Sequence, residues 1–314
     1  MTKNIKGRIE AAMRRIIMDA RKQNIGKSKA AEKASYRKKC AAAKANGESF
    51  PAFSGIFSDG SMNTYIQHCH TFINWCVLQH PDVKNWGECR KYALPYLQYC
   101  AKNVTAQTLH TYQYALAAGF RTTPAEMEMS HIARHTADYS RSRVLSESNI
   151  PFATLDKYKD DRDFIIGTGA RRGGLAHLRK TDICVKNGEV FVFLFEKGGK
   201  GRWAPVLPQY AKTVQRMMND SPGYHCGKQG YQTGYVFPQN HYDVHFGVHR
   251  YRAQYCALWY EELMRRGYAS GELYKCRAYR YGEVYDKELL RLVSQYTGHN
   301  RPSIIVESYS YLQK

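Results

Sequence analysis

The chain contains 314 residues, which is enough for two domains that each bury a hydrophobic core. Its 47 Lys and Arg residues against 27 Asp and Glu residues give a formal net charge of +20, and a surplus of this size favours a polyanionic partner, most often nucleic acid. No run of 18 apolar residues occurs and the amino terminus lacks an apolar signal core, so we expect a cytoplasmic protein that neither is secreted nor spans a membrane.

The nine cysteines do not form a recognisable framework. Their number is odd, they are scattered, and no two have the C-x-x-C spacing, which fits reduced thiols better than disulfides or a zinc ribbon. His68 and His70 flank Cys69, but side chains two residues apart on a helix point in different directions. We therefore expect no metal site at this position.

The first 48 residues are the most basic part of the chain. They hold 14 Lys and Arg residues against four acids, so their net charge of +10 is half of the total. Apolar residues recur at helical spacing over 5–17, and residues 28–46 are rich in Ala and Lys. This pattern predicts an extension over 1–48 made of two basic helices, or a partly disordered arm that orders on DNA. A helical extension that only adds solubility is the alternative.

Residues 49–122 predict a small all-α domain. After a turn-rich segment, Ser61 or Asn63 could cap a helix whose apolar stripe spans 65–77. A second helix is predicted over 86–97, and a third over 109–116 that Thr105 could cap. Residues 123–150 lose this periodicity, and we interpret them as a linker.

Residues 151–314 predict an α-rich α+β domain. Helical periodicity predicts one group of helices before residue 183 and another after residue 208. Between them, β-branched and aromatic runs separated by turns at Asn187-Gly188 and Gly198-Gly199 predict three strands. The predicted helices are 153–169, a short one that reaches Lys180, 209–219, 245–267, 285–297 and 302–312, and the predicted strands are 183–186, 190–195 and 203–207. The fold class is therefore multidomain and mainly α, with one small antiparallel sheet.

The first chemical motif spans residues 168–183, Thr-Gly-Ala-Arg-Arg-Gly-Gly-Leu-Ala-His-Leu-Arg-Lys-Thr-Asp-Ile. A glycine lets this turn approach a DNA backbone, and Arg171 could form two hydrogen bonds to one phosphate. The motif resembles the first box of the tyrosine recombinases, the phage integrase family, in which leucines at +4 and +7 and an aspartate at +11 follow the arginine. Leu175, Leu178 and Asp182 match, whereas Gly174 stands where the family commonly has a glutamate.

Three further boxes follow in the order that the family shows. The segment 196–202 resembles the hairpin that carries a catalytic lysine, and its position favours Lys197 over Lys200. His249-Arg250-Tyr251-Arg252 resembles the H-x-x-R box, whose first and last residues share one helix face. The segment 292–299 matches the L-G-H box, with Thr297 in place of the leucine, and Asn300-Arg301-Pro302 is a common continuation among integrases of mobile elements.

The last box supplies the nucleophile. Tyr309 lies ten residues after His299, and Tyr311 is further out of register, so the resemblance favours Tyr309. On a helix the two tyrosines differ by about 200°, so only one of them could face a phosphate. Few residues follow either tyrosine, and an additional stretch over 268–284 could take part in contacts between protomers.

The resemblance implies a site-specific recombinase that cleaves and rejoins double-stranded DNA through a 3′-phosphotyrosyl intermediate, as an integrase of a mobile element would. It implies that Arg171 and Arg252 bind the phosphate, that His249 is a general base or proton relay, that His299 bonds the phosphate, and that the lysine is the acid. The implied DNA contacts are Arg172, Lys200, Arg202, Arg250 and Arg301.

The resemblance also implies the domain roles and the partners. Residues 49–122 would be a SAM-like core-binding domain and residues 151–314 the catalytic domain, with no metal ion or other cofactor. A homotetramer on two DNA sites, accessory proteins that bend DNA, and a place in the bacterial cytoplasm or nucleoid would follow. A type IB topoisomerase-like or telomere-resolving enzyme is one alternative, and a degenerate homologue that only binds DNA is another.

Overall fold

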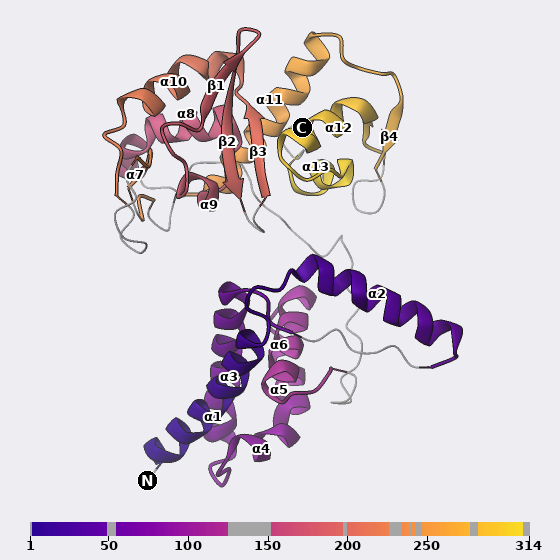
Figure 1. Cartoon of the computed structure of the whole chain (residues 1–314). Helices are drawn as coiled ribbons and strands as arrows, with labels where there is room; N and C mark the ends of the chain where they lie inside the picture. Colours follow the sequence, from indigo (N-terminus) through magenta and orange to yellow (C-terminus); the bar gives the residue numbers. More distant parts are fainter. Residues whose placement is uncertain are drawn as a thin grey trace. The chain divides into compact units, whose positions relative to one another are not determined.

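The computed structural model describes residues 2–48, 55–124, 152–196, 200–225, 234–238, 240–242, 246–276 and 282–309 (Figure 1). It divides into two compact units, Met1–Asp138 and Tyr139–Lys314. The chain is mainly α-helical with small antiparallel sheets, as the sequence predicts. In the described part of the chain, no helix has the length and hydropathy needed to cross a membrane.

The first unit is built from helices alone in its described residues. Ser58 caps α3, because its hydroxyl accepts a hydrogen bond from the Ser61 amide at 3.2 Å, so this helix begins earlier than the predicted caps Ser61 and Asn63. The predicted cap Thr105 is confirmed, since its hydroxyl accepts from the Thr108 amide at 3.3 Å. The elements are α1 (Thr2–Lys22), α2 (Lys29–Ala45), α3 (Asp59–Gln79), α4 (Trp86–Cys89), η1 (Arg90–Tyr92), α5 (Ala93–Ala101) and α6 (Ala106–Gly119).

The helix predicted over 86–97 is broken into α4, η1 and α5. Pro95 lies in the first turn of α5, where its missing N–H and fixed φ are tolerated, whereas in a helix interior both would disrupt the preceding turn. Trp86 stacks on Phe120 with ring centroids 4.1 Å apart and donates its indole N–H to the Gly119 carbonyl at 2.8 Å. A Cβ on Gly119 would lie 3.0 Å from the Trp86 ring, so a side chain at this position would push the ring away by a few tenths of an ångström.

Helix α1 belongs to the core of the first unit. Ile9, Met13 and Ile17, one face of this helix at helical spacing, are almost completely buried and pack with the core residues of α3 and α6. The sequence predicts α1 and α2 together as an extension over 1–48. In the structure α1 instead shares the hydrophobic core of the helical domain, because its apolar stripe needs a partner surface.

The second unit combines a three-stranded antiparallel sheet, in the order β1-β2-β3, with helices. The predicted turn at Asn187-Gly188 is confirmed, because both residues have positive φ, 52° and 79°, between the paired residues Lys186 and Glu189. The elements before the long central helix are α7 (Phe152–Lys157), α8 (Lys159–Thr168), α9 (Arg172–Leu175), β1 (Ile183–Lys186), β2 (Glu189–Glu196), β3 (Lys200–Pro205), η5 (Pro208–Tyr210) and α10 (Ala211–Asp220).

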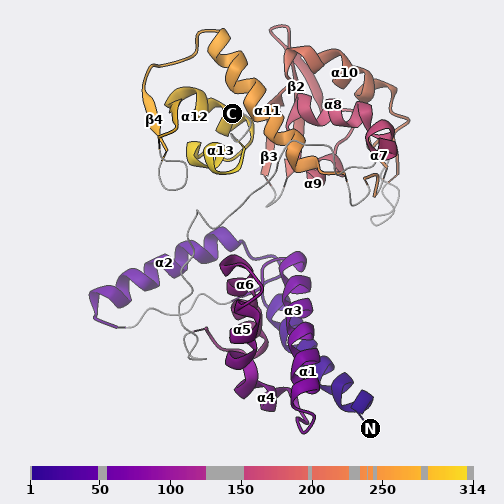
Figure 2. The ribbon, with the colours of Figure 1, turned by 180° about the vertical axis from the view of Figure 1, so that it is seen from behind.

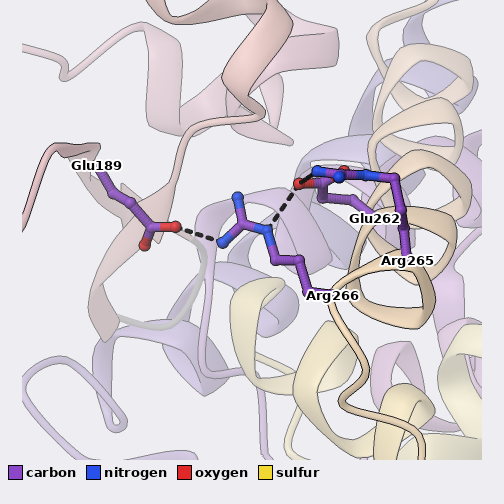
Figure 3. Close-up of polar contacts among 4 residues, drawn as sticks. All are labelled: Glu189, Glu262, Arg265 and Arg266. Carbon is purple, nitrogen blue, oxygen red and sulfur yellow. Dashed lines mark hydrogen bonds and ion pairs between the residues drawn. The ribbon is translucent and has the colours of Figure 1, made fainter.

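Helix α11 (Val248–Arg265) runs through the core of this unit between α8 and α12, as both views show (Figure 2). Its end is attached to β2, because Arg266 donates from Nε to Glu262 at 2.7 Å and from Nη1 to Glu189 (Figure 3). Arg265 donates to the other oxygen of the Glu262 carboxylate at 2.8 Å. The remaining elements are β4 (Leu273–Lys275), β5 (Val284–Asp286), α12 (Lys287–Tyr296) and α13 (Pro302–Ser308).

A second antiparallel sheet, formed by β4 and β5, was not predicted. It lies in and beside the additional stretch 268–284, and its strands of three residues are too short to show an alternating pattern. Tyr285 turns inward, and Asp286 caps α12 by accepting from the Glu288 and Leu289 amides at 3.0 Å. The helix predicted over 285–297 therefore begins at Lys287.

Candidate active site

The end of α8 directs Arg171 into the centre of the second unit. Gly169 terminates α8 in the left-handed conformation with φ of +61°, and a Cβ there would lie 2.5 Å from the Tyr255 ring. Glycine is therefore required both by the backbone angle and by the close approach of Tyr255. The chain then extends through Arg171, the residue before α9, and the Arg171 side chain is half-buried.

Arg171, His299 and Tyr309 lie next to one another. Arg171 Nη2 is 2.8 Å from His299 Nε2, and His299 Nε2 is 3.3 Å from Tyr309 Oη. A guanidinium only donates, so Nε2 acts as the acceptor and the imidazole proton resides on Nδ1 in this arrangement. This nitrogen has one lone pair, so the Tyr309 hydroxyl can donate to it only when Arg171 turns to another acceptor.

Arg252 joins this group through Tyr309. It is completely buried on α11, and its Nε donates to Tyr309 Oη at 3.3 Å. Its Nη2 donates to the Thr297 carbonyl at 2.5 Å, and its Nη1 donates to the Gly169 carbonyl. A buried charge requires such partners, and these carbonyls fix the plane of the guanidinium.

The turn between α12 and α13 carries His299. The Thr297 hydroxyl donates to the Val293 and Ser294 carbonyls at 3.0 Å, and the His299 amide donates to the Ser294 carbonyl at 2.9 Å. Gly298 has a φ of +72°, which lets the chain reverse at this point. The threonine that replaces the usual leucine of the resembled box is thus buried with its hydroxyl bonded to the end of its own helix.

Tyr309 follows directly after α13, which ends at Ser308 and is shorter than predicted. Only 4% of Tyr309 is exposed, and its amide donates to the Ile305 carbonyl at 2.8 Å. Its ring centroid lies 5.8 Å from that of His299 and 5.7 Å from Arg252 Cζ. Tyr311 lies outside the described residues, so the choice between the tyrosines stays a prediction.

The structure says less about the predicted catalytic lysine and about His249, the first histidine of the motifs. Lys197 lies outside the described residues, and Lys200 opens β3 opposite Glu196 without a described side chain. His249, the second residue of α11, has an exposed side chain. The choice between the lysines and the role of His249 stay predictions, while the histidine whose contact with Tyr309 is described is His299.

Two of the arginines that were predicted to contact DNA donate hydrogen bonds to carbonyls of the protein itself. Arg172 donates to the Phe246 carbonyl at 2.8 Å and to the Tyr242 carbonyl at 3.2 Å. Arg202 donates to the Gly169 carbonyl at 3.2 Å and to the Tyr296 carbonyl. The other two differ in exposure, since Arg250 is half-buried and Arg301 is exposed, and the Arg301 amide donates to the Ser294 hydroxyl at 2.7 Å.

The positive charges converge on one place. Burial raises the pKa of the Cys256 thiol to about 12, and Arg252, Arg202 and Arg171 all act in the opposite direction on this pKa. The three guanidinium groups therefore lie near enough to the same buried thiol on α11 to act on its charge. A centre with this charge can bind an anion, and the contact between phenol and imidazole provides a path for a proton.

Sequence reasoning identified the side chains of this centre but missed the carbonyls that hold them. The carbonyl oxygens of Gly169, Tyr296 and Thr297 orient Arg202 and Arg252. The sequence signal for two of these turns was a glycine with positive φ, Gly169 in the first and Gly298 after Thr297 in the second. No three His, Cys, Asp or Glu side chains gather as a possible metal site in the described ranges.

Comparison with solved structures finds recombinases. XerH site-specific recombinase bound to palindromic difH substrate matches at 14% identity over 100% of this chain and 94% of that chain, with a TM-score of 0.47. The Tn1549 transposon integrase in complex with circular intermediate DNA matches at 14% identity over 71% of this chain and 81% of that chain, with a TM-score of 0.38. XerA recombinase matches at 12% identity over 88% and 94%, with a TM-score of 0.30.

These solved structures are of tyrosine recombinases and integrases, the family that the sequence motifs resemble. Comparison with models of protein families gives no match, and comparison with curated proteins gives none either.

Proposed function

We propose that this chain is a tyrosine recombinase that cleaves and rejoins double-stranded DNA at a specific site through a 3′-phosphotyrosyl intermediate. The observation that carries the proposal is the position of Tyr309 Oη, which lies 3.3 Å from both His299 Nε2 and Arg252 Nε. A phenol with an ordinary pKa near 10 is a weak nucleophile at neutral pH, so it needs both a proton acceptor and a nearby positive charge.

The first step forms a bond between Tyr309 Oη and the phosphorus and breaks the bond from phosphorus to the 5′ oxygen. Once Arg171 turns from His299 to the phosphate, His299 Nε2 accepts the phenolic proton, a role that the resemblance gives to His249. Arg171 and Arg252 stabilise the additional negative charge on the non-bridging oxygens, each by roughly 10²–10³ in rate. The hairpin lysine, Lys197 or Lys200, would protonate the leaving 5′ oxygen.

Rejoining reverses these transfers. The free 5′ hydroxyl of the same or another strand gives its proton to the hairpin lysine and attacks the phosphorus, the bond from phosphorus to Tyr309 Oη breaks, and His299 returns the proton to Oη. Because guanidinium groups supply the charge that metal ions supply in many phosphoryl transfer enzymes, we expect cleavage to require no added metal ion.

Several finer features are part of the proposal. Integration or excision of a mobile element, assembly of four protomers on two DNA sites, and help from DNA-bending proteins all follow from the resemblance. The net charge of +20 supports binding to DNA.

The test is to trap the covalent adduct. The protein is incubated with a library of nicked duplexes, in which the cleaved fragment diffuses away and rejoining fails, and DNA that stays attached after denaturation is sequenced. We expect an adduct whose modified residue, mapped by mass spectrometry, is Tyr309. Tyr309→Phe should abolish it, and Tyr311→Phe, the matched control, should preserve it.

Two other results would lead to different functions. DNA binding without any adduct would favour a homologue that only binds DNA. An adduct accompanied by relaxation of supercoiled DNA by a monomer, without a second specific site, would favour the topoisomerase-like alternative.

A further inference from the structure

Arg202 connects three separate parts of the second unit. Its backbone is in β3, its Nη2 donates to the carbonyl of Gly169 at 3.2 Å, and its Nη1 donates to the carbonyl of Tyr296. Gly169 ends α8 and Tyr296 is the last residue of α12. Carbonyls at helix C-termini lack intrahelical partners and carry partial negative charge, so a guanidinium fork that reaches two of them satisfies both.

The acceptors of Arg202 are linked to those of Arg252. The Gly169 carbonyl accepts from both arginines, and the second acceptor of Arg252, the Thr297 carbonyl, belongs to the residue after Tyr296. A shift in either carbonyl of Arg202 would therefore move an acceptor of Arg252. The turn that starts at Thr297 also carries His299, so the same shift would move the imidazole.

The aliphatic part of Arg202 packs against this turn. A Cβ on Gly298 would lie 3.0 Å from Arg202 Cδ, so the arginine stem and the turn are in close contact. The end of β3 is fixed as well, because the Tyr255 hydroxyl on α11 donates to the Pro205 carbonyl at 2.9 Å. Arg202 is half-buried in this surrounding, which suits a structural brace better than a contact with solvent-exposed phosphate.

We propose that Arg202 is a positioning residue of the reaction centre, the group formed by Arg171, Arg252, His299 and Tyr309 with the arginines that hold it. In this role Arg202 fixes the Arg252 guanidinium and the His299 turn relative to each other and does not contact DNA. This inference rests on the proposed function. It assigns to the hairpin strand a task beyond carrying the general acid.

The first test separates positioning from DNA affinity. In single-turnover experiments with saturating nicked substrate, the Arg202→Ala variant should cleave roughly 10²-fold more slowly than the wild type. A displacement of catalytic groups by about 1 Å has an effect of this size on the rate. Its dissociation constant for DNA and the dependence of binding on salt should match those of the wild type. Arg216→Ala, which removes an exposed arginine of the same unit that pairs with Asp160, is the control and should cleave normally.

A second variant guards against misfolding. Arg202→Lys keeps the positive charge but cannot form a planar fork to two carbonyls, so it should fold and still cleave at least tenfold more slowly. In an Arg252→Lys background, Arg202→Ala should slow cleavage by less than about a further threefold, because residues that act through one another are not additive. Full independent effects in the double variant would overturn the proposal.

A third measurement does not depend on catalysis. The His299 amide is bonded to the Ser294 carbonyl, so its hydrogen exchange in the full-length chain reports on the turn. In Arg202→Ala this exchange should accelerate, while amides of α3 and α6 in the first unit should be unchanged. Unchanged exchange at the turn, together with weaker DNA binding and a smaller salt dependence, would make Arg202 a phosphate contact. If the wild type forms no adduct, the proposed function fails, whereas the exchange still decides whether Arg202 holds the turn.

Discussion

Two cationic regions of the molecule, helix α2 and the reaction centre, hold their charges in opposite ways. Helix α2 presents its basic residues to solvent, and they are Lys29, Lys33, Arg37, Lys38, Lys39 and Lys44. The reaction centre buries Arg252 completely and Arg171 and Arg202 partly, with hydrogen bonds to carbonyls or to His299. Exposed charges attract a polyanion over a distance that salt shortens, whereas bonded and buried charges act at one fixed point. Affinity and catalysis should therefore be separable by mutation.

The largest expected effect lies in the reaction centre. Arg171→Ala removes the group bonded to His299 Nε2 and should slow adduct formation on a nicked substrate by roughly 10²–10³-fold. Binding to the same DNA, measured by fluorescence anisotropy, should stay within about twofold, because only one of many positive charges is removed. If binding and cleavage fell in proportion, Arg171 would contribute only affinity.

The second effect concerns α2 and should show the opposite pattern. Replacing Lys33, Arg37 and Lys44 by Gln should reduce the slope of log K against log salt by about 0.9 for each phosphate that the protein no longer neutralises, without changing single-turnover cleavage at saturation. The control adds the same side chain at exposed alanines of the same helix, Ala34→Gln, Ala41→Gln and Ala45→Gln, and should leave the slope unchanged.

A salt dependence that does not respond to the three α2 substitutions would reduce this helix to a means of solubility. Substitutions are a cleaner test than deletion of residues 1–48, because deletion would also remove α1. The buried Ile9, Met13 and Ile17 of α1 are part of the core of the first unit, so their removal would destabilise the whole unit.

The features that the sequence predicts correctly depend on neighbouring residues. Thr105 caps its helix and Asn187-Gly188 forms its turn because each needs only a few adjacent residues to act. The order of the recombinase boxes is likewise visible in the chain itself. These signals gave the fold class and the side chains that meet around Tyr309.

The features that the sequence misses depend on distant partners. Arg171 and His299 are 128 positions apart, and Arg252 and Gly169 are 83 positions apart, so nothing local indicates which nitrogen meets which oxygen. In the sequence Arg202 looks like a DNA contact, because it is an arginine beside a basic hairpin. Only the structure shows that its guanidinium donates to carbonyls at the ends of two distant helices. The pairing of β4 with β5 was missed because each strand has three residues.

The third prediction compares a buried carboxylate with its exposed neighbour. Asp161 Oδ1 accepts from the Tyr242 hydroxyl at 3.2 Å and lies 2.8 Å from His241 Nε2. Burial and the Asp161 charge raise the pKa of Tyr242 well above its ordinary value, so this phenol stays a donor. Asp161→Asn should lower the free energy of unfolding by about 1–3 kcal/mol, since a neutral amide oxygen is a weaker acceptor than the buried carboxylate.

Asp160 is the matched control for Asp161. It is exposed and paired with Arg216, so Asp160→Asn should change the free energy of unfolding by at most about 0.5 kcal/mol in the same urea titration. Arg172 bonds to the carbonyl of Tyr242, so the weaker bond from Tyr242 to residue 161 in Asp161→Asn should also slow cleavage several-fold by loosening the residue beside Arg171. Equal effects of the two substitutions would contradict a special role for the buried carboxylate.

The smallest expected effect is at Glu262, where α11 is attached to β2 (Figure 3). Hydrogen bonds from Arg265 and Arg266 lower the pKa of Glu262 from its ordinary 4.5 to about 2. The ionised carboxylate therefore stabilises the folded state fully above pH 4.5, and this contribution declines as the pH falls from about 4.5 to about 2. Glu262→Gln should lower the free energy of unfolding at pH 7 by about 1 kcal/mol, because the pairs are partly solvated.

Urea midpoints at pH 7, 4 and 3 would check this prediction, and the difference between wild type and Glu262→Gln should shrink across that series. Glu261 is the adjacent exposed residue, and Glu261→Gln should show little difference at any of these pH values. A difference for Glu262→Gln that stays constant down to pH 3 would mean that side-chain packing, rather than the charge on the carboxylate, holds the end of α11 to β2. In that case the contrast between fixed and exposed charges would apply to the reaction centre alone.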